Sequence, residues 1–279
     1  MRLFVVAWVS TSLCMKRWIP FIKSPPRVAV IRLAGTIGTG GRAPLSDEAL
    51  APVIERAFKR GKPTAVALVI NSPGGSPVQS ALIAGRIRRL ADEKNIPVHA
   101  FVEDVAASGG YWLACAADDI WADAGSIVGS IGVISAGFGA HEFLAQHGIE
   151  RRVHTAGKSK SQMDPFKPEN AEDVARLKTI LDDMHGIFID YVRDRRGDRL
   201  AQDETLFTGA FWLAQRAGAL GLIDGLGQVD RTLKDVYGDK VVMIPYGRRR
   251  SIMQRFGMTM ANDALGVIEE RAAFARFGL

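Results

Sequence analysis

The chain has few residues of the kinds that cross-link small domains or hold metal ions. Only two of its 279 residues are cysteines, so a disulfide framework is not supported. Cys115 lies in an apolar segment and is expected to be a small core residue, whereas Cys14 lies near the N-terminus. No histidine stands at zinc-ligand spacing from a cysteine, and we expect no metal and no cofactor. The scattered histidines are His99, His141, His147, His154 and His185.

A strong excess of charge is also missing. The net charge is +6, and 24% of the residues are charged against 47% apolar ones, which is typical of a folded soluble protein. The densest basic cluster is Arg248–Arg250. A nucleic-acid-binding surface needs a wider basic stripe with interleaved aromatic residues, so we expect no nucleic-acid partner. The cluster fits a solvated turn, or a contact with anionic lipid.

No apolar run reaches the length of a bilayer-spanning helix. The longest N-terminal run, residues 3–15, has 13 residues, and a span needs about 20. Arg2 precedes this run, and Lys16, Arg17 and Lys23 follow it. Three interpretations stay open: a membrane anchor or signal segment, a peripheral membrane contact, and a translation start at Met15.

The rest of the chain alternates between short apolar segments and helical periodicity. This alternation predicts βαβ crossovers, and therefore an α/β fold with a largely parallel sheet. Two of the expected helices, 46–60 and 170–195, carry a long apolar stripe, and Ser46 is expected to cap the first of them. The expected strands are 27–34, 64–70, 97–102, 120–122, 131–134 and 151–154, and the other expected helices are 77–93, 111–117, 141–147 and, at the C-terminus, 251–279.

A serine and a lysine stand in glycine-rich surroundings that suit acyl transfer. Ser108 precedes Gly109 and Gly110, and Lys160 follows Gly157. A serine hydroxyl needs a base before it can attack at neutral pH, and a lysine can be that base if its pKa falls to roughly 7–8. Glycines expose backbone N–H groups that can hold an oxyanion. These residues point to a serine hydrolase.

Five motifs in a fixed order make this interpretation specific. The sequence from about residue 28 to residue 236 resembles signal peptide peptidase A and the SohB-type serine peptidases. That resemblance implies a ClpP/crotonase-like α/β fold, which is built from repeated β-β-α units. The motifs are Asn71–Gly75, Ser108–Tyr111, Gly129–Val133, Lys160–Phe166 and the segment from Thr208 to Gly227.

The resemblance assigns a role to each site residue. Ser108 is the expected nucleophile, Lys160 the general base, and Ser130 the hydroxyl that orients the base. The N–H groups of Gly75 and Gly109 form the expected oxyanion hole. Lys158 competes with Lys160, which we favour because the Lys-Ser-x-x-Asp-Pro-Phe motif begins at Lys160. Without the resemblance, Ser108 could be a helix cap, Ser130 and the glycines parts of ordinary turns, and each lysine a surface residue.

The implied activity is that of a serine endopeptidase with a Ser/Lys dyad. Its expected substrates are extended, apolar peptides such as cleaved signal peptides, and its expected assembly is a homo-oligomer that can associate with the membrane, in a bacterial inner membrane or the cytoplasm. One alternative mechanism is a Ser-His-Asp triad that uses His154 and Asp164. Two alternative functions are a crotonase-type acyl-CoA enzyme and an inactive membrane-associated scaffold.

Three segments follow from these patterns. Residues 1–26 form an N-terminal apolar and basic segment, residues 27–240 a peptidase domain, and residues 241–279 a C-terminal segment with an amphipathic helix. Ile252, Phe256 and Met260 belong to one apolar side of that helix. This side can pack on its own subunit or a neighbouring one, or can lie on an anionic membrane surface.

Overall fold

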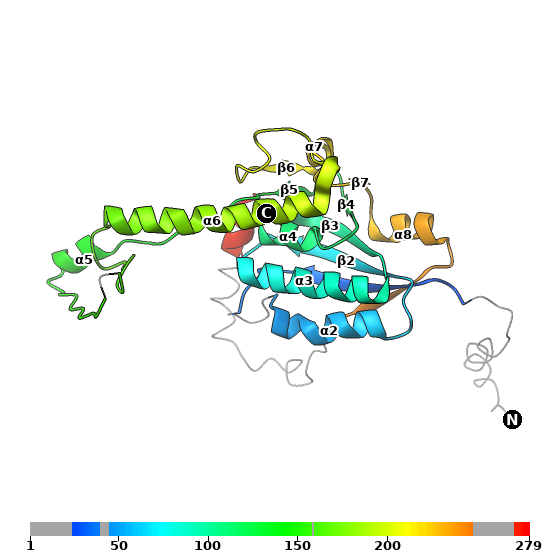
Figure 1. Ribbon diagram of the computed structural model, residues 1–279, viewed down its shortest axis with the longest axis horizontal. Helices are drawn as coiled ribbons and strands as arrows, with labels where there is room; N and C mark the ends of the chain where they lie inside the picture. Colours follow the sequence, from blue (N-terminus) through cyan, green and yellow to red (C-terminus); the bar gives the residue numbers. More distant parts are fainter. Residues whose placement is uncertain (1–23, 40–44, 158, 248–270) are drawn as a thin grey trace, which may run out of the picture.

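A mostly parallel sheet runs through the body of the protein, with helices packed against it (Figure 1). The computed structural model describes residues 24–39, 45–157, 159–247 and 271–279. The strand order is β6-β5-β3-β2-β1-β8, and β4 pairs with both β3 and β7. Every pair is parallel except β5 with β6. The largely parallel α/β architecture expected from the sequence is therefore present.

The elements follow one another along the described chain as strands and helices in alternation. The strands are β1 (Arg27–Ala34), β2 (Ala65–Ser72), β3 (Val98–Ala107), β4 (Asp119–Ala122), β5 (Ile127–Gly129), β6 (Phe211–Leu213), β7 (Gly225–Leu226) and β8 (Val242–Tyr246). The helices are α2 (Asp47–Lys59), α3 (Pro77–Lys94), α4 (Gly109–Ala114), α5 (His141–Gln146), α6 (Ala171–Arg196), α7 (Ala214–Ala219) and α8 (Val229–Tyr237), with a 3-10 turn at Gly197–Arg199.

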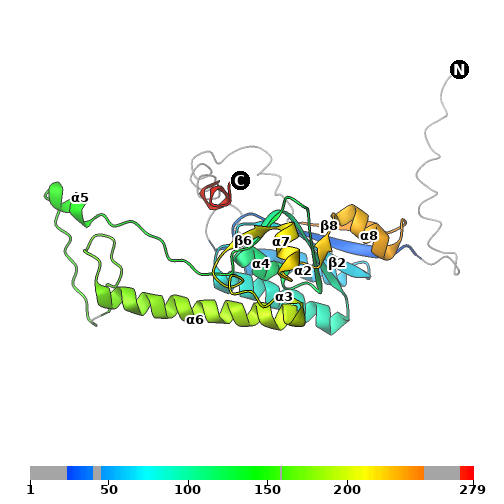
Figure 2. The same ribbon diagram turned by 90° about the horizontal axis from the view of Figure 1, so that it is seen from above.

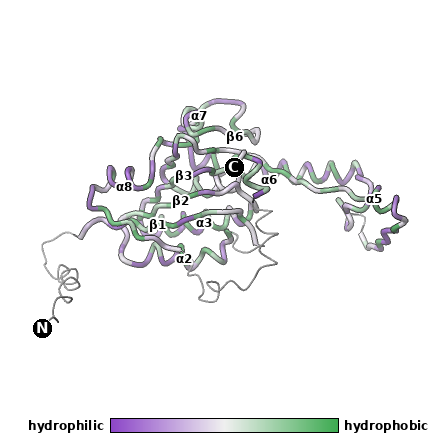
Figure 3. Tube along the Cα trace, turned by 180° about the vertical axis from the view of Figure 1, so that it is seen from behind, coloured by the Kyte–Doolittle hydropathy of each residue, from purple (hydrophilic) through white to green (hydrophobic). Residues whose placement is uncertain are grey.

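The core forms where the sequence pattern predicts it. Strand β2 is buried along nearly all its length, as its continuous apolar run requires for a central strand (Figure 3). The Ser46 side chain accepts a hydrogen bond from the Ala49 N–H at 3.3 Å and caps α2. The apolar stripe expected on this helix is buried; it consists of Leu50, Val53, Ile54, Ala57 and Phe58.

Other expectations do not hold. Residues 131–134 and 151–154 form no strand, because neither segment pairs with a strand in the described chain: the first follows the end of β5, and the second lies between α5 and α6. The third expected strand continues past residue 102 to Ala107. Val242–Tyr246 pairs with β1, so the sheet extends past the boundary expected at residue 240.

An arm projects from the body of the protein (Figures 1 and 2). We define the arm as residues 134–170, which include α5, together with the N-terminal half of α6. Of the apolar face expected on α6, only Phe188 is buried, and it lies in the C-terminal half, beside the body. The arm exposes several large apolar side chains, with exposed fractions of 64% for Ile134, 94% for Phe138, 59% for Phe143, 53% for Ile149 and 40% for Phe166.

Several expectations fall outside the described residues. They concern the N-terminal apolar run at 3–15, Lys158, the basic cluster Arg248–Arg250 and most of the C-terminal helix, of which residues 271–275 are described and are helical. In the described part of the chain, no helix combines the length and the apolar character needed to cross a membrane.

Candidate active site

Ser108 occupies a sharp turn between the central strand β3 and helix α4. Its φ of 50° and ψ of −122° are unusual for a residue with a side chain. It is the N-cap residue of α4, yet its hydroxyl makes no capping hydrogen bond. The hydroxyl therefore remains available for chemistry at the positive end of a short helix. Such strained backbone is common at functional sites.

Strand register brings Ser130 beside Ser108. Ala107 pairs with Gly129 across β3 and β5, and a serine follows each of these residues. The Ser108 N–H donates to the Gly129 carbonyl at 2.8 Å, and the Ser130 N–H donates to the Ala210 carbonyl at 2.7 Å. Ser130 also has a positive φ, 54°. Two hydroxyls that are separated in the sequence thus lie at the carboxyl ends of neighbouring strands.

The Gly74–Gly75 turn packs tightly against the Ser108 turn. Both glycines have a positive φ, 101° and 144°. A Cβ on Gly74 would lie 2.8 Å from the Gly109 nitrogen and from the Ser108 Cβ, so a larger residue does not fit. The Ile37 N–H donates to the Gly74 carbonyl, and the Ile37 carbonyl accepts from the Ser76 N–H. The Gly75 N–H takes part in neither of these bonds. In the described chain, neither the Gly75 N–H nor the Gly109 N–H donates a hydrogen bond to the backbone of a turn, loop or helix cap.

These turns form the wall of a cavity of about 420 Å³. Ser108, Ser130, Gly75 and Gly109 all line it, so four of the five expected site residues share one cavity. Most of the remaining wall is apolar. Trp112 and Ile134 come from the segments that follow Ser108 and Ser130, whereas Met184, Phe188 and Phe277 come from distant parts of the chain.

Lys160 lies elsewhere. It is exposed, belongs to a turn between α5 and α6 on the arm, and does not line the cavity. Its backbone N–H donates to the Gly157 carbonyl at 3.2 Å. Within one chain, the structure therefore does not bring the expected base to the expected nucleophile.

The Asp-Pro-Phe part of the motif around Lys160 fixes the shape of this turn. The Asp164 carboxylate accepts a hydrogen bond from the Phe166 N–H at 3.1 Å and pairs with Arg151 at 3.4 Å. These two partners, the N–H first, hold the pKa of Asp164 below its usual value. Arg151 also lies over the Phe166 ring, 5.3 Å from its centroid. Asp164 is thus a structural residue of the arm.

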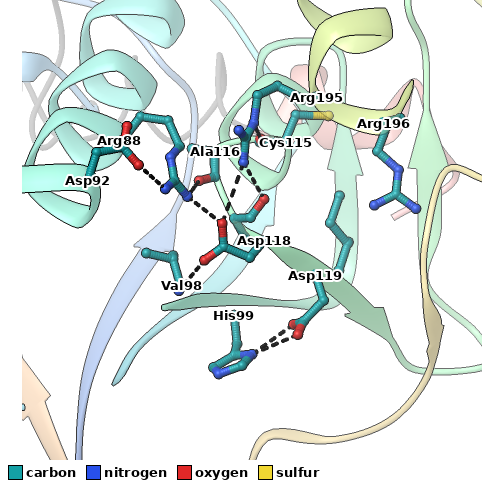
Figure 4. Close-up of polar contacts among 12 residues, drawn as sticks. Arg88, Asp92, Val98, His99, Cys115, Ala116, Asp118, Asp119, Arg195 and Arg196 are labelled. Carbon is teal, nitrogen blue, oxygen red and sulfur yellow. Dashed lines mark hydrogen bonds and ion pairs between the residues drawn. The ribbon is translucent and has the colours of Figure 1, made fainter. Parts of the chain in front are cut away.

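The histidines do not form the alternative triad within the described chain. His154 is exposed and makes no hydrogen bond or ion pair with Asp164. His99 lies near the start of β3, whereas Ser108 follows the end of that strand. The His99 ring bonds to Asp119 (Figure 4) and to Tyr237. His185 on α6 lies within 3.0 Å of the Ile131 carbonyl, one residue after Ser130. It is absent from the cavity lining.

Two arginines bind carbonyl groups at the C-terminal end of helix α4 (Figure 4). Arg88 on α3 donates to the Ala116 carbonyl at 3.1 Å, and Arg195 on α6 donates to the Cys115 and Ala117 carbonyls at 2.7 and 2.8 Å. These carbonyls have no partner further along the helix, so the two arginines act as a C-terminal cap. Cys115 is buried, as the sequence predicted, and burial raises the pKa of its thiol to about 12.

Loss of this cap should loosen α4. We expect Arg195→Gln to lower the free energy of unfolding by about 1.5–3 kcal/mol, because charge-assisted hydrogen bonds to two buried carbonyls are lost. Chemical denaturation followed by circular dichroism measures the change. Arg89→Gln is the matched control, since Arg89 forms only an exposed pair with Glu93. Equal stability of the Arg195 variant and the control would contradict a capping role.

Sequence reasoning missed the residues that line the cavity from a distance. Trp112 stacks between Phe188 and Tyr191 of α6, with centroid distances of 4.7 and 4.9 Å. The periodicity of α6 indicated an apolar face but not what that face covers. Arg276 and Phe277 line the same cavity from the other end of the chain. No sequence signal connects them to Ser108.

Comparison with known proteins places the chain in a family. The sequence model of peptidase family S49 matches residues 91–242, more than half of the chain. The probable protease SohB of Haemophilus influenzae is 29% identical over 73% of this chain and 57% of its own length. A Brucella abortus protein named Na(+)/H(+) antiporter NhaA is 47% identical over 95% of this chain, which corresponds to 39% of that protein. The chain thus spans about two fifths to three fifths of the length of these relatives.

Solved structures agree with this assignment at the level of the fold. A lysine-to-alanine mutant of the 1510-N membrane-bound stomatin-specific protease, in complex with a substrate peptide, superposes with a TM-score of 0.53 at 15% identity. The alignment covers 88% of this chain and all of that one. The ClpP/crotonase-like α/β fold expected from the motifs is confirmed. The chain belongs to peptidase family S49.

Proposed function

We propose that the chain is a serine endopeptidase in which Ser108 is the nucleophile and Lys160 the general base. The observation that carries this proposal is the cavity that gathers Ser108, Ser130 and the two glycines Gly75 and Gly109. In the first step, the Ser108 Oγ attacks the peptide carbonyl carbon while Lys160 accepts the hydroxyl proton. The lysine then gives this proton to the departing amine, and water hydrolyses the acyl-enzyme.

Backbone N–H groups stabilise the tetrahedral intermediate in this mechanism. The Gly75 and Gly109 nitrogens lie on the two turns that pack against each other beside Ser108. Such donors are preorganised for an oxyanion, and losing one typically slows the reaction by about 10²–10³-fold. Ser130, adjacent to Ser108 through the strand register, is the proposed hydroxyl partner of the lysine.

The cavity favours extended peptides with apolar side chains. Trp112, Met184 and Phe188 offer apolar surface, and Ser108 lies at its edge. We therefore propose that the substrates are apolar peptides such as cleaved signal peptides.

The names of the relatives support a peptidase, and one structural neighbour was solved as a lysine mutant with a substrate peptide bound. The antiporter name describes a protein of which this chain matches 39%, and we do not extend it to this chain. Nothing favours acyl-CoA chemistry or an inactive scaffold.

Assembly of several copies would complete the site. Lys160 lies on the arm, outside the cavity lined by its own Ser108. The arm also exposes Phe138, Phe143 and Ile149, which a second copy could cover. We therefore propose a homo-oligomer in which the arm of one copy brings Lys160 to the Ser108 cavity of the next.

Mixing two inactive variants tests this arrangement. Purified Ser108→Ala and Lys160→Ala proteins, unfolded and refolded together in equal amounts, should recover about a quarter of the wild-type activity, because random pairing joins an intact serine to an intact lysine at that frequency. Each variant refolded alone should stay inactive. A fluorophosphonate probe counts the active sites through their reaction with Ser108.

The possible outcomes separate the ideas. No recovery from the mixture, with a fully active wild-type refolding control, would place both residues in one chain and refute the shared site. A wild-type protein that hydrolyses no peptide and reacts with no probe at Ser108 would refute the peptidase itself.

A further inference from the structure

The C-terminal segment returns to the candidate active site. Residues 271–275 are helical (the C-terminal segment is red in Figures 1 and 2). Phe274 and Phe277 pack against a small cluster formed by Val105, Ala107 and Ile127. The Phe277 ring meets that of Phe211 edge to face, with a centroid distance of 5.1 Å. This cluster lies on β3 and β5, the strands that end at Ser108 and Ser130. The segment is thus attached beside both serines.

This attachment places one cation at the wall of the Ser108 cavity. Arg276 and Phe277 line the cavity together, and every other lining residue in the described part of the chain is a glycine, a proline, a hydroxyl residue or an apolar residue. Apolar walls screen a charge less than water does. Arg276, an exposed residue, therefore borders the space in which a peptide would bind, and among the described residues no carboxylate lines that space.

We propose that Arg276 is a substrate-recognition residue that binds a carboxylate of the peptide. This inference rests on the proposed function, in which the cavity holds the peptide. An arginine offers a planar fork of donors that matches a carboxylate in two parallel hydrogen bonds. The carboxylate can belong to an acidic side chain or to the free C-terminus of the peptide. Phe277 fixes the turn that carries Arg276, directly after the helical residues 271–275, while the apolar wall accepts the neighbouring side chains of the peptide.

Peptide binding to an inactive variant tests this idea without relying on turnover. Fluorescent apolar peptides are bound to the Ser108→Ala protein in three forms: neutral with an amidated end, amidated with one glutamate placed at each position in turn, and neutral with a free C-terminal carboxylate. We expect one carboxylate form to bind about fivefold more tightly than the neutral peptide, as for a partly exposed ion pair. The difference should shrink as salt is raised.

Variants of the same C-terminal segment show whether Arg276 is responsible. In Ser108→Ala/Arg276→Gln the preference for the carboxylate should disappear, and Arg276→Lys should keep part of it. Arg271→Gln is the matched control, because Arg271 belongs to the same C-terminal segment and does not line the cavity. It should keep the full preference.

The outcomes distinguish this inference from the function on which it rests. Equal binding of all three peptide forms, or a preference that survives Arg276→Gln, would overturn the role of Arg276 and leave the peptidase intact. A wild-type protein that cleaves none of these peptides and resists the fluorophosphonate probe would refute the peptidase. Preference for glutamate identifies an acidic side chain as the ligand, and preference for the free carboxylate identifies the peptide end.

Discussion

Ser108→Ala and Lys160→Ala are each expected to lower kcat for peptide hydrolysis by about 10⁴-fold or more, because nucleophile and base act as a unit. For the same reason, the double variant should be little slower than either single variant. The measurement is cleavage of a quenched fluorescent apolar peptide, with folding of each variant checked by circular dichroism. Lys158→Ala is the matched control, since it removes a lysine two residues from Lys160, and it should retain most of the activity.

A histidine base would give a different pattern. Near-wild-type turnover of Lys160→Ala, together with loss of activity in His185→Ala or His154→Ala, would refute the Ser/Lys assignment. His185 is the informative histidine, because its contact with the Ile131 carbonyl brings it near Ser130.

Chelators should leave the rate of peptide hydrolysis unchanged under a metal-free mechanism. Inhibition by EDTA that added zinc reverses would refute the metal-free mechanism.

The sequence could predict most strands of the sheet and the motifs of the candidate site, but not how these motifs come together. Continuous apolar strands and the capped α2 stripe are local patterns, and burial follows from them directly. The two serines were recognisable as motifs, yet their proximity depends on the pairing of Ala107 with Gly129. Register of this kind is set by the whole sheet, so local patterns alone could not predict it.

The sequence could not predict what the arm contacts. Helical periodicity in α6 predicts an apolar side, but Ile180 and Ile187 on that helix remain exposed, at 44% and 62%. A pattern indicates that a face is apolar and does not identify what covers it. The same limit applies to Lys160, whose motif identifies a candidate base without showing which cavity it serves. A second copy of the chain, as proposed above, would both cover the apolar side chains of the arm and bring Lys160 to a Ser108 cavity.

Within the last motif of the family pattern, which runs from Thr208 to Gly227, the stretch from Gly221 to Asp224 has a structural role. Asp224 forms two hydrogen bonds with Arg196, at 2.7 and 3.1 Å, and accepts a third from the Ile120 N–H at 2.7 Å. The Arg196 side chain is only 2% exposed. Tyr111, three residues after Ser108, donates to the Leu222 carbonyl at 2.8 Å. The motif thus joins the end of α6 to helix α4.

Removing this carboxylate should therefore destabilise the fold. We expect Asp224→Asn to lower the free energy of unfolding by about 3–5 kcal/mol at neutral pH, because Arg196 keeps a buried charge without its partner. Asp230→Asn is the control: it breaks an exposed pair with Lys234 and should change the melting temperature little. Urea unfolding measures the first change, and thermal unfolding compares both.

The pH dependence gives a second test of the same pair. Burial tends to raise the pKa of Asp224, but the Arg196 guanidinium, the Ile120 N–H and Arg199 outweigh it, and the pKa lies below its usual value. A carboxyl group with a lowered pKa in the folded state stabilises the fold above its unfolded pKa of about 3.9, and this contribution is lost as the pH falls through the lower, folded value. The stability difference between wild type and Asp224→Asn should hold at neutral pH and shrink under acid. A difference that grows as the pH falls would show that the charge of Asp224 is not what holds Arg196.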